Sequence, residues 1–435
     1  MTSSPASPTG SGSTGRKSRH FDGFDGLRAL AALSVLMLHV AWVSGFTLRS
    51  WFGLYTSRLD IGVAIFFLIS GFLLYRPFVV AHLSGERPLS TRTFLVRRAL
   101  RILPAYWAAL TILTYGLHLI SIGPGVGGVV SHYALLQIYW PTESFNGIPQ
   151  AWSLATEVSF YLLLPLYAFG LGRRQRTPDR QVRLEIVGVL LLIAISYTFR
   201  WWALNLPWIV VRNGHLTGIC APHCATDPTI ESLMVTWLPA YLDLFGLGML
   251  LAIGSAWYTR REANEPRWLT SRPMPYVAWA LALATYVVIV HLPITRSPLY
   301  FATPAINVLR QTLYGVFALL LLLPAVFGQS RPSLVLGFLR SRILTGAGLV
   351  SYGIYLWHLN FADVLARWLG YKPQAAPILQ LAVATIGLTV AVATASYLIV
   401  ERPLLRLKPR WPRASDRVRP VETQHSPPPP RRPGR

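Results

Sequence analysis

Long apolar segments alternate with short polar ones along most of the chain. Runs of roughly 20 apolar residues, the length that an α-helix needs to cross the hydrocarbon core of a bilayer, recur between residues 27 and 400. The sequence predicts ten transmembrane helices, over residues 27–47, 59–81, 101–122, 153–171, 184–203, 236–256, 275–292, 308–328, 345–369 and 376–399. The expected fold class is therefore an all-α polytopic membrane protein.

The composition agrees with this expectation. The chain has 435 residues, of which 53% are hydrophobic and only 13% charged, and its mean hydropathy is +0.43. Soluble domains contain about 25% charged residues, and a soluble chain of this length would divide into several domains joined by polar linkers. An ordinary soluble protein is excluded.

The basic residues predict the orientation of the helices. The net charge is +23, but the positive charges lie in short clusters between apolar segments, so nucleic acid is not an expected partner. With the N-terminus inside, 32 of the 40 Lys and Arg residues lie on the inner side. By the positive-inside rule we expect both termini in the cytoplasm and a multi-pass location in the cell membrane.

Three regions are expected along the chain. Residues 1–20 are predicted to be a disordered basic arm, residues 21–405 the membrane domain, and residues 406–435 a disordered tail rich in Pro and Arg. The predicted outer loop holds Cys220 and Cys224. A small disulfide loop is the favoured interpretation. A metal site would need further ligands, and no metal is expected.

Ionisable side chains inside membrane spans are costly and therefore suggest function. His39 follows Arg28 by eleven residues, which is about 16 Å along a helix and places it near mid-membrane. An imidazole there can act as a general base near neutral pH; the alternative is a histidine that only joins two helices. Arg28 is expected to pair with Asp25.

Glu157 is an acidic residue inside an apolar span. We expect it to orient His39 and to stabilise the protonated imidazole, as the carboxylate does in a hydrolase triad. The alternative is a polar contact that only joins helices. In the span 59–81, Ser70 and Gly71 interrupt the apolar run, and close helix approach is the favoured interpretation of both small residues.

Arg97, Arg98 and Arg101 lie together just before the third predicted helix. Guanidinium groups suit phosphate oxygens, so this cluster is predicted to bind a nucleotide-bearing cofactor from the cytosol; the alternative is a cluster that only sets topology. Tyr355 and His358 lie on one stripe of the ninth predicted helix. Substrate or cofactor binding and aromatic packing are equally compatible with that stripe.

Six short motifs occur in order along the chain. They are the Arg28-to-His39 spacing, FFLISGFL (66–73), RRALRILPAYW (97–107), WSLATEVSFY (152–161), SYGIYLWH (351–358) and ERP (401–403). In these motifs and in its topology, the chain resembles the acyltransferase-3 family of bacterial membrane O-acyltransferases. The resemblance covers about residues 24–403.

The resemblance implies an enzyme that moves an acyl group, commonly acetyl, from cytosolic acyl-CoA to a hydroxyl group. The acceptor would be a sugar, a glycolipid, a cell-wall polymer or a macrolide-type natural product. His39 would be the essential histidine and Glu157 the acidic residue of its motif. Arg28 would be the partner of His39 in its motif.

Donor binding is implied for a further set of residues. They are Arg28, Arg97, Arg98, Arg101, Ser70, Tyr355 and His358. The hydroxyls of Ser70 and Tyr355 are also candidates to stabilise an oxyanion. Direct transfer is favoured over an acyl-enzyme because no nucleophile stands out.

The expected partners are acyl-CoA, a hydroxyl-bearing acceptor and the lipid bilayer; a homodimer is left open. The competing interpretation is a proton-coupled transporter or flippase in which His39 and Glu157 relay protons. That interpretation gives the arginine cluster no role.

Overall fold

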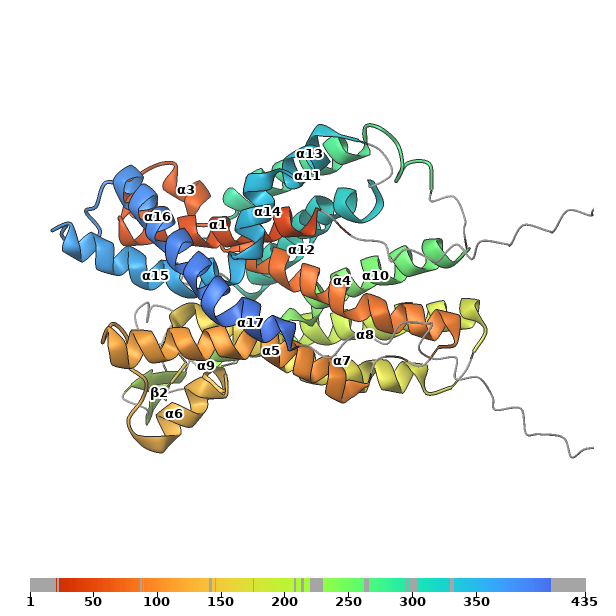
Figure 1. The fold of residues 1–435 in the computed structure, drawn as a ribbon, viewed down its shortest axis with the longest axis horizontal. Coiled ribbons are helices and arrows are strands. Elements are labelled where there is room, and N and C mark those ends of the chain that lie inside the picture. The colour runs from red at the N-terminus through yellow and green to blue at the C-terminus, as the bar shows by residue number, and fades with distance from the viewer. Residues whose placement is uncertain are drawn as a thin grey trace, which may run out of the picture.

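Long helices that run roughly along one axis make up nearly all of the computed structural model (Figure 1). The structure describes residues 21–407, except residues 22, 87, 89, 141–142, 145, 175, 207–208, 213–214, 220–229, 262–265, 295, 297–302 and 329–331. Cys220, Cys224, the basic arm over residues 1–20 and all but the first two residues of the tail over 406–435 lie outside the described residues. The predictions made for them stay predictions.

The long helices are joined by short helices and turns. The helices are α1 Phe24–Val43, α2 Phe46–Arg49, α3 Gly53–Thr56, α4 Ile61–Ser84, α5 Thr91–Thr111, η1 Ile112–Gly116, α6 Gly125–Tyr133, η2 Gln137–Tyr139, η3 Pro149–Ala151, α7 Trp152–Gly172, α8 Pro178–Leu204, α9 Ile230–Met234, η4 Leu238–Tyr241, α10 Leu242–Arg261, α11 Met274–Val290, α12 Pro304–Phe327, α13 Leu334–Leu339, α14 Arg342–Leu349, α15 Ser351–Trp368, α16 Ile378–Ser396, η6 Tyr397–Glu401 and α17 Arg402–Arg406.

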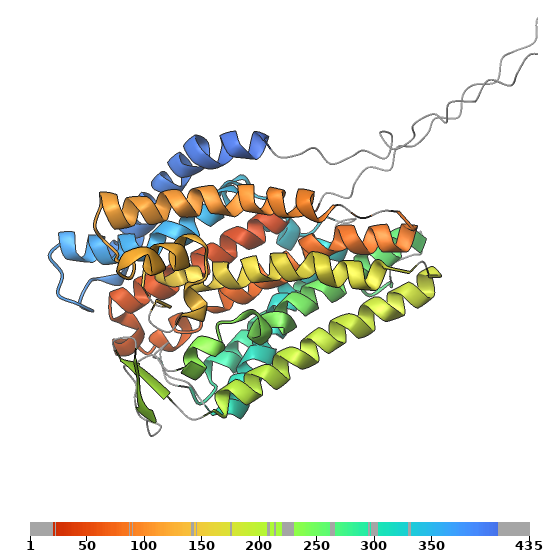
Figure 2. The ribbon, with the colours of Figure 1, turned by 90° about the horizontal axis from the view of Figure 1, so that it is seen from below.

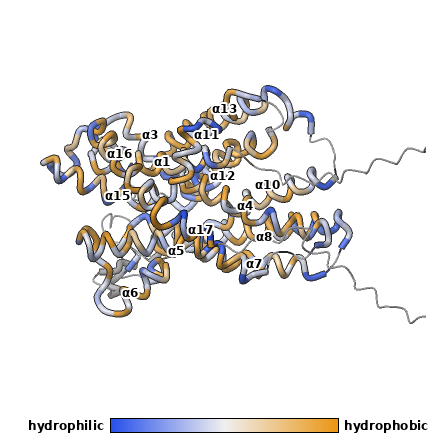
Figure 3. The backbone as a smooth tube through the Cα atoms, viewed as in Figure 1, coloured by the Kyte–Doolittle hydropathy of each residue, from blue (hydrophilic) through white to orange (hydrophobic). Residues whose placement is uncertain are grey.

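Each of the ten predicted spans overlaps a helix of the described chain. Seven helical segments among the described residues are long and apolar enough to cross a membrane, which makes this a multi-pass membrane protein. The three other matching helices are α5, which carries the arginine cluster, α11, which has 17 residues, and α15. The total of ten spans and the side on which the termini lie remain predictions. Figure 3 shows the apolar colour along the helices and the polar colour at their ends.

One small hairpin occurs in the otherwise all-α chain that the structure describes. The strands β1 (Ile209–Arg212) and β2 (His215–Ile219) pair as an antiparallel hairpin. The hairpin lies at the end of the bundle that also carries α6 (Figures 1 and 2). It falls in the predicted outer loop, between two helices and outside the apolar segments, so the hydropathy pattern gave no signal for it.

The central helix of the bundle is α4, which packs against α1, α7, α8, α10 and α12. Its closest neighbour is α10, and two glycines explain the close approach. A Cβ on Gly71 would lie 2.1 Å from the carbonyl oxygen of Phe245, and a Cβ on Gly248 would lie 2.1 Å from that of Leu68. The prediction that Gly71 permits close helix packing is thus consistent with the structure.

The helices are staggered along their common axis. The Ser34 hydroxyl, in the middle of α1, donates a hydrogen bond of 2.6 Å to the carbonyl of Leu59, just before α4 begins. Likewise Gln150, just before α7, donates 3.1 and 3.0 Å hydrogen bonds to the carbonyls of Tyr355 and Leu356 within α15. Both α4 and α7 therefore begin deep in the bundle, and their first turns face the middle of neighbouring helices.

The contact between α4 and α10 predicts the effect of a single methyl group. We expect Gly248→Ala to destabilise the protein by about 1–3 kcal/mol, because the added Cβ forces the helix backbones apart. Thermal unfolding in detergent measures this loss. The control is Gly170→Ala in α7, where a Cβ would meet no atom within 4 Å and the higher helix propensity of Ala should be neutral or stabilising. Equal behaviour of the two variants would contradict the packing argument.

Candidate functional site

A cavity of about 100 Å³ lies where α1, α4, α5, α7 and α15 meet. Six residues predicted to form the site line it, namely Arg28, Ser70, Arg98, Arg101, Glu157 and Tyr355. The other lining residues are Val63, Phe66, Phe67, Ile69, Leu73, Leu74, Ile102, Ser153, Leu154, Tyr161, Ser351 and Tyr352. Five of the six motifs thus contribute to one cavity, although they lie on five different helices.

The centre of the cavity is polar. The Ser70 hydroxyl donates a short hydrogen bond to the Glu157 carboxylate. Arg28 and Arg98 both interact electrostatically with that carboxylate. Ser70 therefore has a specific polar role, in contrast to the favoured expectation that it only lets helices approach. Its neighbour Gly71 points to α10, because successive residues of a helix face different directions.

Arg28 also pairs with Asp25, as the sequence predicted. Its Nη1 donates a 2.8 Å hydrogen bond to the Asp25 carboxylate. A further acid, Glu401, is buried and lies within electrostatic range of Arg101. Glu401 belongs to the terminal ERP motif and ends the π-helical segment η6. Asp25 and Glu401, which do not line the cavity, thus balance part of the positive charge of the arginines that do.

The arginine end leads into a second, smaller cavity. It measures about 30 Å³ and is lined by Arg97, Pro77, Phe78 and Phe94 together with Leu73, Leu74 and Arg98, which line both cavities. Arg97 therefore lies beside the main cavity and not in its wall. From Val63 to Pro77, the two cavities follow α4 for about 21 Å.

The opposite end of the main cavity is apolar except for two hydroxyl groups. Ser153 and Tyr355 share a 2.7 Å hydrogen bond, and the Tyr355 hydroxyl also donates to the carbonyl of Gln150 at 3.2 Å. Together with the amide of Gln150, these contacts hold the start of α7 against α15. Gln150 was missed by sequence reasoning because it lies before the predicted helix, in a segment without periodicity.

Two histidines lie just beyond this apolar end. The rings of Tyr355 and His358 have centroids 5.8 Å apart, and His358 forms a 2.8 Å hydrogen bond from its Nε2 to Nδ1 of His39. His358 is completely buried. The structure therefore places His39 behind Tyr355, adjacent to the cavity but outside its lining.

The hydrogen bonds of this histidine pair determine its tautomers. His358 Nδ1 lies 3.0 Å from the carbonyl of Ile354, and a carbonyl only accepts, so this nitrogen carries the proton. In the neutral ring, His358 Nε2 is then an acceptor, and His39 Nδ1 must donate to it. The lone pair of His39 is then on Nε2, which can accept a proton.

The predicted pairing of His39 with Glu157 is not what the structure shows. In the described chain the two share no hydrogen bond: His39 bonds to His358, and Glu157 accepts from Ser70. The stagger explains the difference. Both α4 and α7 begin level with the middle of a neighbouring helix. Glu157, in the second turn of α7, is therefore not level with His39 near the C-terminal end of α1. Among the described residues, the side chain that contacts the His39 ring through a hydrogen bond is His358 and not Glu157.

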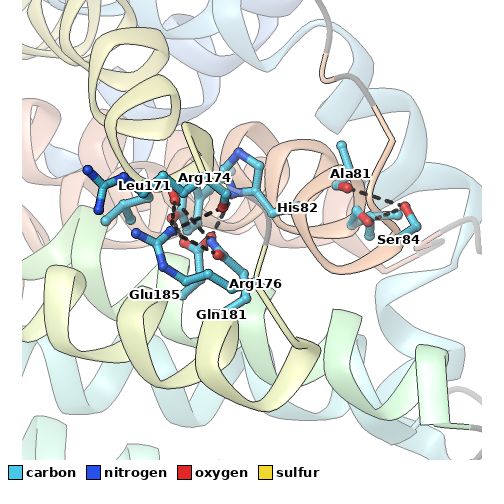
Figure 4. A network of polar contacts seen from close by, with 10 residues as sticks. Ala81, His82, Ser84, Leu171, Arg174, Arg176, Gln181 and Glu185 are labelled. Atoms are coloured by element: carbon cyan, nitrogen blue, oxygen red, sulfur yellow. Dashed lines mark hydrogen bonds and ion pairs between the residues drawn. The ribbon is translucent and has the colours of Figure 1, made fainter.

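A second polar network lies outside the cavity, on another face of α4 (Figure 4). Glu185 of α8 is completely buried and accepts hydrogen bonds from Tyr75, from His82 at 2.7 Å and from Gln181 at 2.8 Å. Gln181 in turn donates to the carbonyl of Leu171, at the end of α7. The network joins α4, α7 and α8. Its signal in the sequence was a lone acid inside an apolar span.

The fold and the cavity define a polytopic membrane protein with a site that is cationic at one end and borders a histidine pair at the other. The acyltransferase-3 family model, described as an acyltransferase domain, matches residues 21–400. The chain therefore belongs to this family and is a membrane acyltransferase, as its motifs predicted.

Curated relatives agree with this membership. The chain is 26% identical over 373 residues to nodulation protein 10 of Rhizobium leguminosarum bv. viciae, and the aligned region covers 80% of this chain and 82% of that protein. It is 24% identical over 352 residues to the exopolysaccharide production protein ExoZ of Rhizobium meliloti, and the aligned region covers 79% of this chain and 89% of that protein.

The network around Glu185 predicts a large cost of removing its carboxylate. We expect Glu185→Leu to destabilise the protein by about 3 kcal/mol or more, because three buried donors lose their acceptor. Thermal unfolding in detergent measures the loss. Glu185→Gln keeps one acceptor oxygen and should lose clearly less. Equal losses in the two variants would show that the hydrogen bonds are not what stabilises this contact.

Proposed function

We propose that this protein is an O-acyltransferase that takes an acyl group, most simply acetyl, from cytosolic acyl-CoA and transfers it to a hydroxyl group. The observation that carries the proposal is the polarity of the cavity. Three guanidinium groups line one part of it, and the histidine pair lies behind the opposite end. This arrangement suits a ligand whose anionic part and reactive part are far apart.

Acyl-CoA is such a ligand. Its phosphates would bind Arg28, Arg98 and Arg101, with Arg97 at the continuation of the cavity. The pantetheine arm would follow α4, along which the cavities extend about 21 Å. The thioester would then lie at the apolar end beside Tyr355. Because CoA is cytosolic, the arginine end would face the cytoplasm, in line with the predicted orientation in the cell membrane.

The acceptor we propose is a carbohydrate hydroxyl. One relative is named for exopolysaccharide production, and a sugar polymer offers many hydroxyl groups. A glycolipid, a cell-wall polymer or a macrolide-type product would present the same chemical group. The acceptor would approach His39 from the side of the pair that faces away from the arginines.

The reaction needs one base and one acid, and His39 can be both. In the proposed step, His39 Nε2 takes the proton of the acceptor hydroxyl while the oxygen attacks the thioester carbonyl. The C–O bond forms, the C–S bond breaks, and the leaving thiolate takes the proton back from the imidazolium. The Tyr355 and Ser153 hydroxyls lie at the end of the cavity where the oxyanion would develop.

His358 would act as a positioning residue. By accepting from His39 Nδ1, it holds the tautomer in which Nε2 is free, and it supports the charge that develops on the ring. The family membership favours this reaction over the competing transporter. In addition, His39 and Glu157 bond to different partners, which removes the direct contact that a proton relay between them would use.

Replacing His39 tests the base. We expect His39→Ala to lower kcat by about 100-fold or more, measured as release of the CoA thiol from acetyl-CoA by the purified protein, with water or an added sugar as acceptor. Binding of acetyl-CoA should change little, because His39 does not line the cavity. Near-normal turnover in His39→Ala would contradict the assignment.

Replacing His358 tests the positioning role. His358→Gln retains an oxygen that can accept from His39 Nδ1, whereas His358→Leu does not. We therefore expect the Gln variant to keep much more of the wild-type kcat than the Leu variant, at similar KM. If both variants lose the same activity, His358 contributes only packing.

The arginines predict an effect on the donor. The double variant Arg98→Ala with Arg101→Ala should raise KM for acetyl-CoA about tenfold or more, because each lost guanidinium removes a charge-assisted contact to phosphate. The matched control is Arg92→Ala, on the same helix but exposed. If the double variant and Arg92→Ala raise the KM for acetyl-CoA by the same factor, or if neither variant changes it, the cluster only sets topology.

A further inference from the structure

Aromatic side chains line the apolar end of the cavity. Val63, Phe66 and Phe67 of α4 and Leu154 of α7 line this end. Phe66 packs against two hydrophobic clusters. The first surrounds the cavity, and the second is formed by α1, α15 and α16; α1 and α15 also carry the histidine pair. Its ring meets that of Tyr355 edge-on, with centroids 5.8 Å apart. Phe66 therefore lines the apolar end of the cavity and also packs against the second cluster, to which α1 and α15 contribute.

We propose that Phe66 sets the longest acyl chain that the enzyme accepts. This inference rests on the proposed function, because it takes acyl-CoA as the donor. With the phosphates at the arginines and the thioester beside Tyr355, the acyl group projects toward Val63 and Phe66 at the apolar end. A chain longer than acetyl then meets the Phe66 ring, which has to move or be displaced.

The neighbouring aromatic rings are more firmly held than Phe66. Tyr355 is fixed by the hydrogen bond of its hydroxyl to Ser153. Phe67 stacks on Phe245 with centroids 4.7 Å apart and also contacts Tyr241. Phe66 is only partly buried and has no polar atom to anchor it. Of the three rings, it is the one whose size determines the depth of the cavity.

The test is a series of donors with increasing chain length. The kcat/KM for CoA release is measured with acetyl-, propionyl-, butyryl- and hexanoyl-CoA for the wild type and for Phe66→Ala. We expect the ratio of kcat/KM for butyryl-CoA to that for acetyl-CoA to rise about tenfold or more in the variant, the range that one or two methylene groups contribute in a hydrophobic pocket. Phe66→Trp should shift the same ratio in the opposite direction.

A matched control separates this role from packing. Phe160→Ala removes an equally large buried side chain, which stacks on Phe245 at 4.0 Å but does not line the cavity. We expect it to reduce stability without changing the ratio. If Phe66→Ala does not fold, Phe66→Leu provides the same test with a smaller change in volume.

The outcomes distinguish the inference from the function on which it rests. If the wild type releases CoA from acetyl-CoA but the ratio is the same in all Phe66 variants, Phe66 does not set chain length and only this inference fails. If the wild type releases CoA from none of the four donors, the proposed function fails. A ratio that moves equally in the Phe160 variant would also overturn the inference.

Discussion

Charged groups inside a membrane bundle must find partners within the protein, and this constraint shapes the whole site. Glu157 is the one carboxylate in the lining of a cavity that also holds three arginines. It accepts from Ser70 on α4 and interacts with Arg28 of α1 and Arg98 of α5. These helices converge on the carboxylate, and Asp25 and Glu401 supply further negative charge to Arg28 and Arg101.

The second consequence of this constraint is a separation of tasks along the bundle. The arginines line one end of the cavity and the histidine pair lies beyond Tyr355 at the other, so in the proposed function phosphate recognition and proton transfer would fall to different ends of the site. The staggered helices make the separation possible: α7 begins beside the middle of α15, so that its first residues cover the apolar end of the cavity. A long ligand that is anionic at one end and reactive at the other matches this geometry in one orientation only.

The sequence predicted much of this arrangement. The apolar runs located the helices, and the cost of burying charge singled out Arg28, His39 and Glu157, because a polar residue in an apolar run needs a reason. The pairing could not be predicted in the same way. The sequence gives the depth of a residue only as its distance from the end of its own helix, and a comparison between helices then assumes that all of them begin at one surface. The hydrogen bond from Ser34, in the middle of α1, to Leu59, just before α4, shows that they do not. The β1–β2 hairpin was missed because it belongs to no motif or periodic pattern, whereas Glu185 carried the signal of a lone acid in an apolar span but lies at the very start of that span and in no motif.

The central claim is that a single donor molecule extends from the arginines to the histidine pair. A structure determined by electron cryomicroscopy with a non-transferable acetyl-CoA analogue, in which a methylene group stands between the sulfur and the acetyl carbonyl, tests it most directly. The account predicts phosphates at Arg28, Arg98 and Arg101 and the acetyl carbonyl beside Phe66 and Tyr355. An analogue bound at the opposite face of the bundle, or with its acetyl group far from His39, would contradict the account.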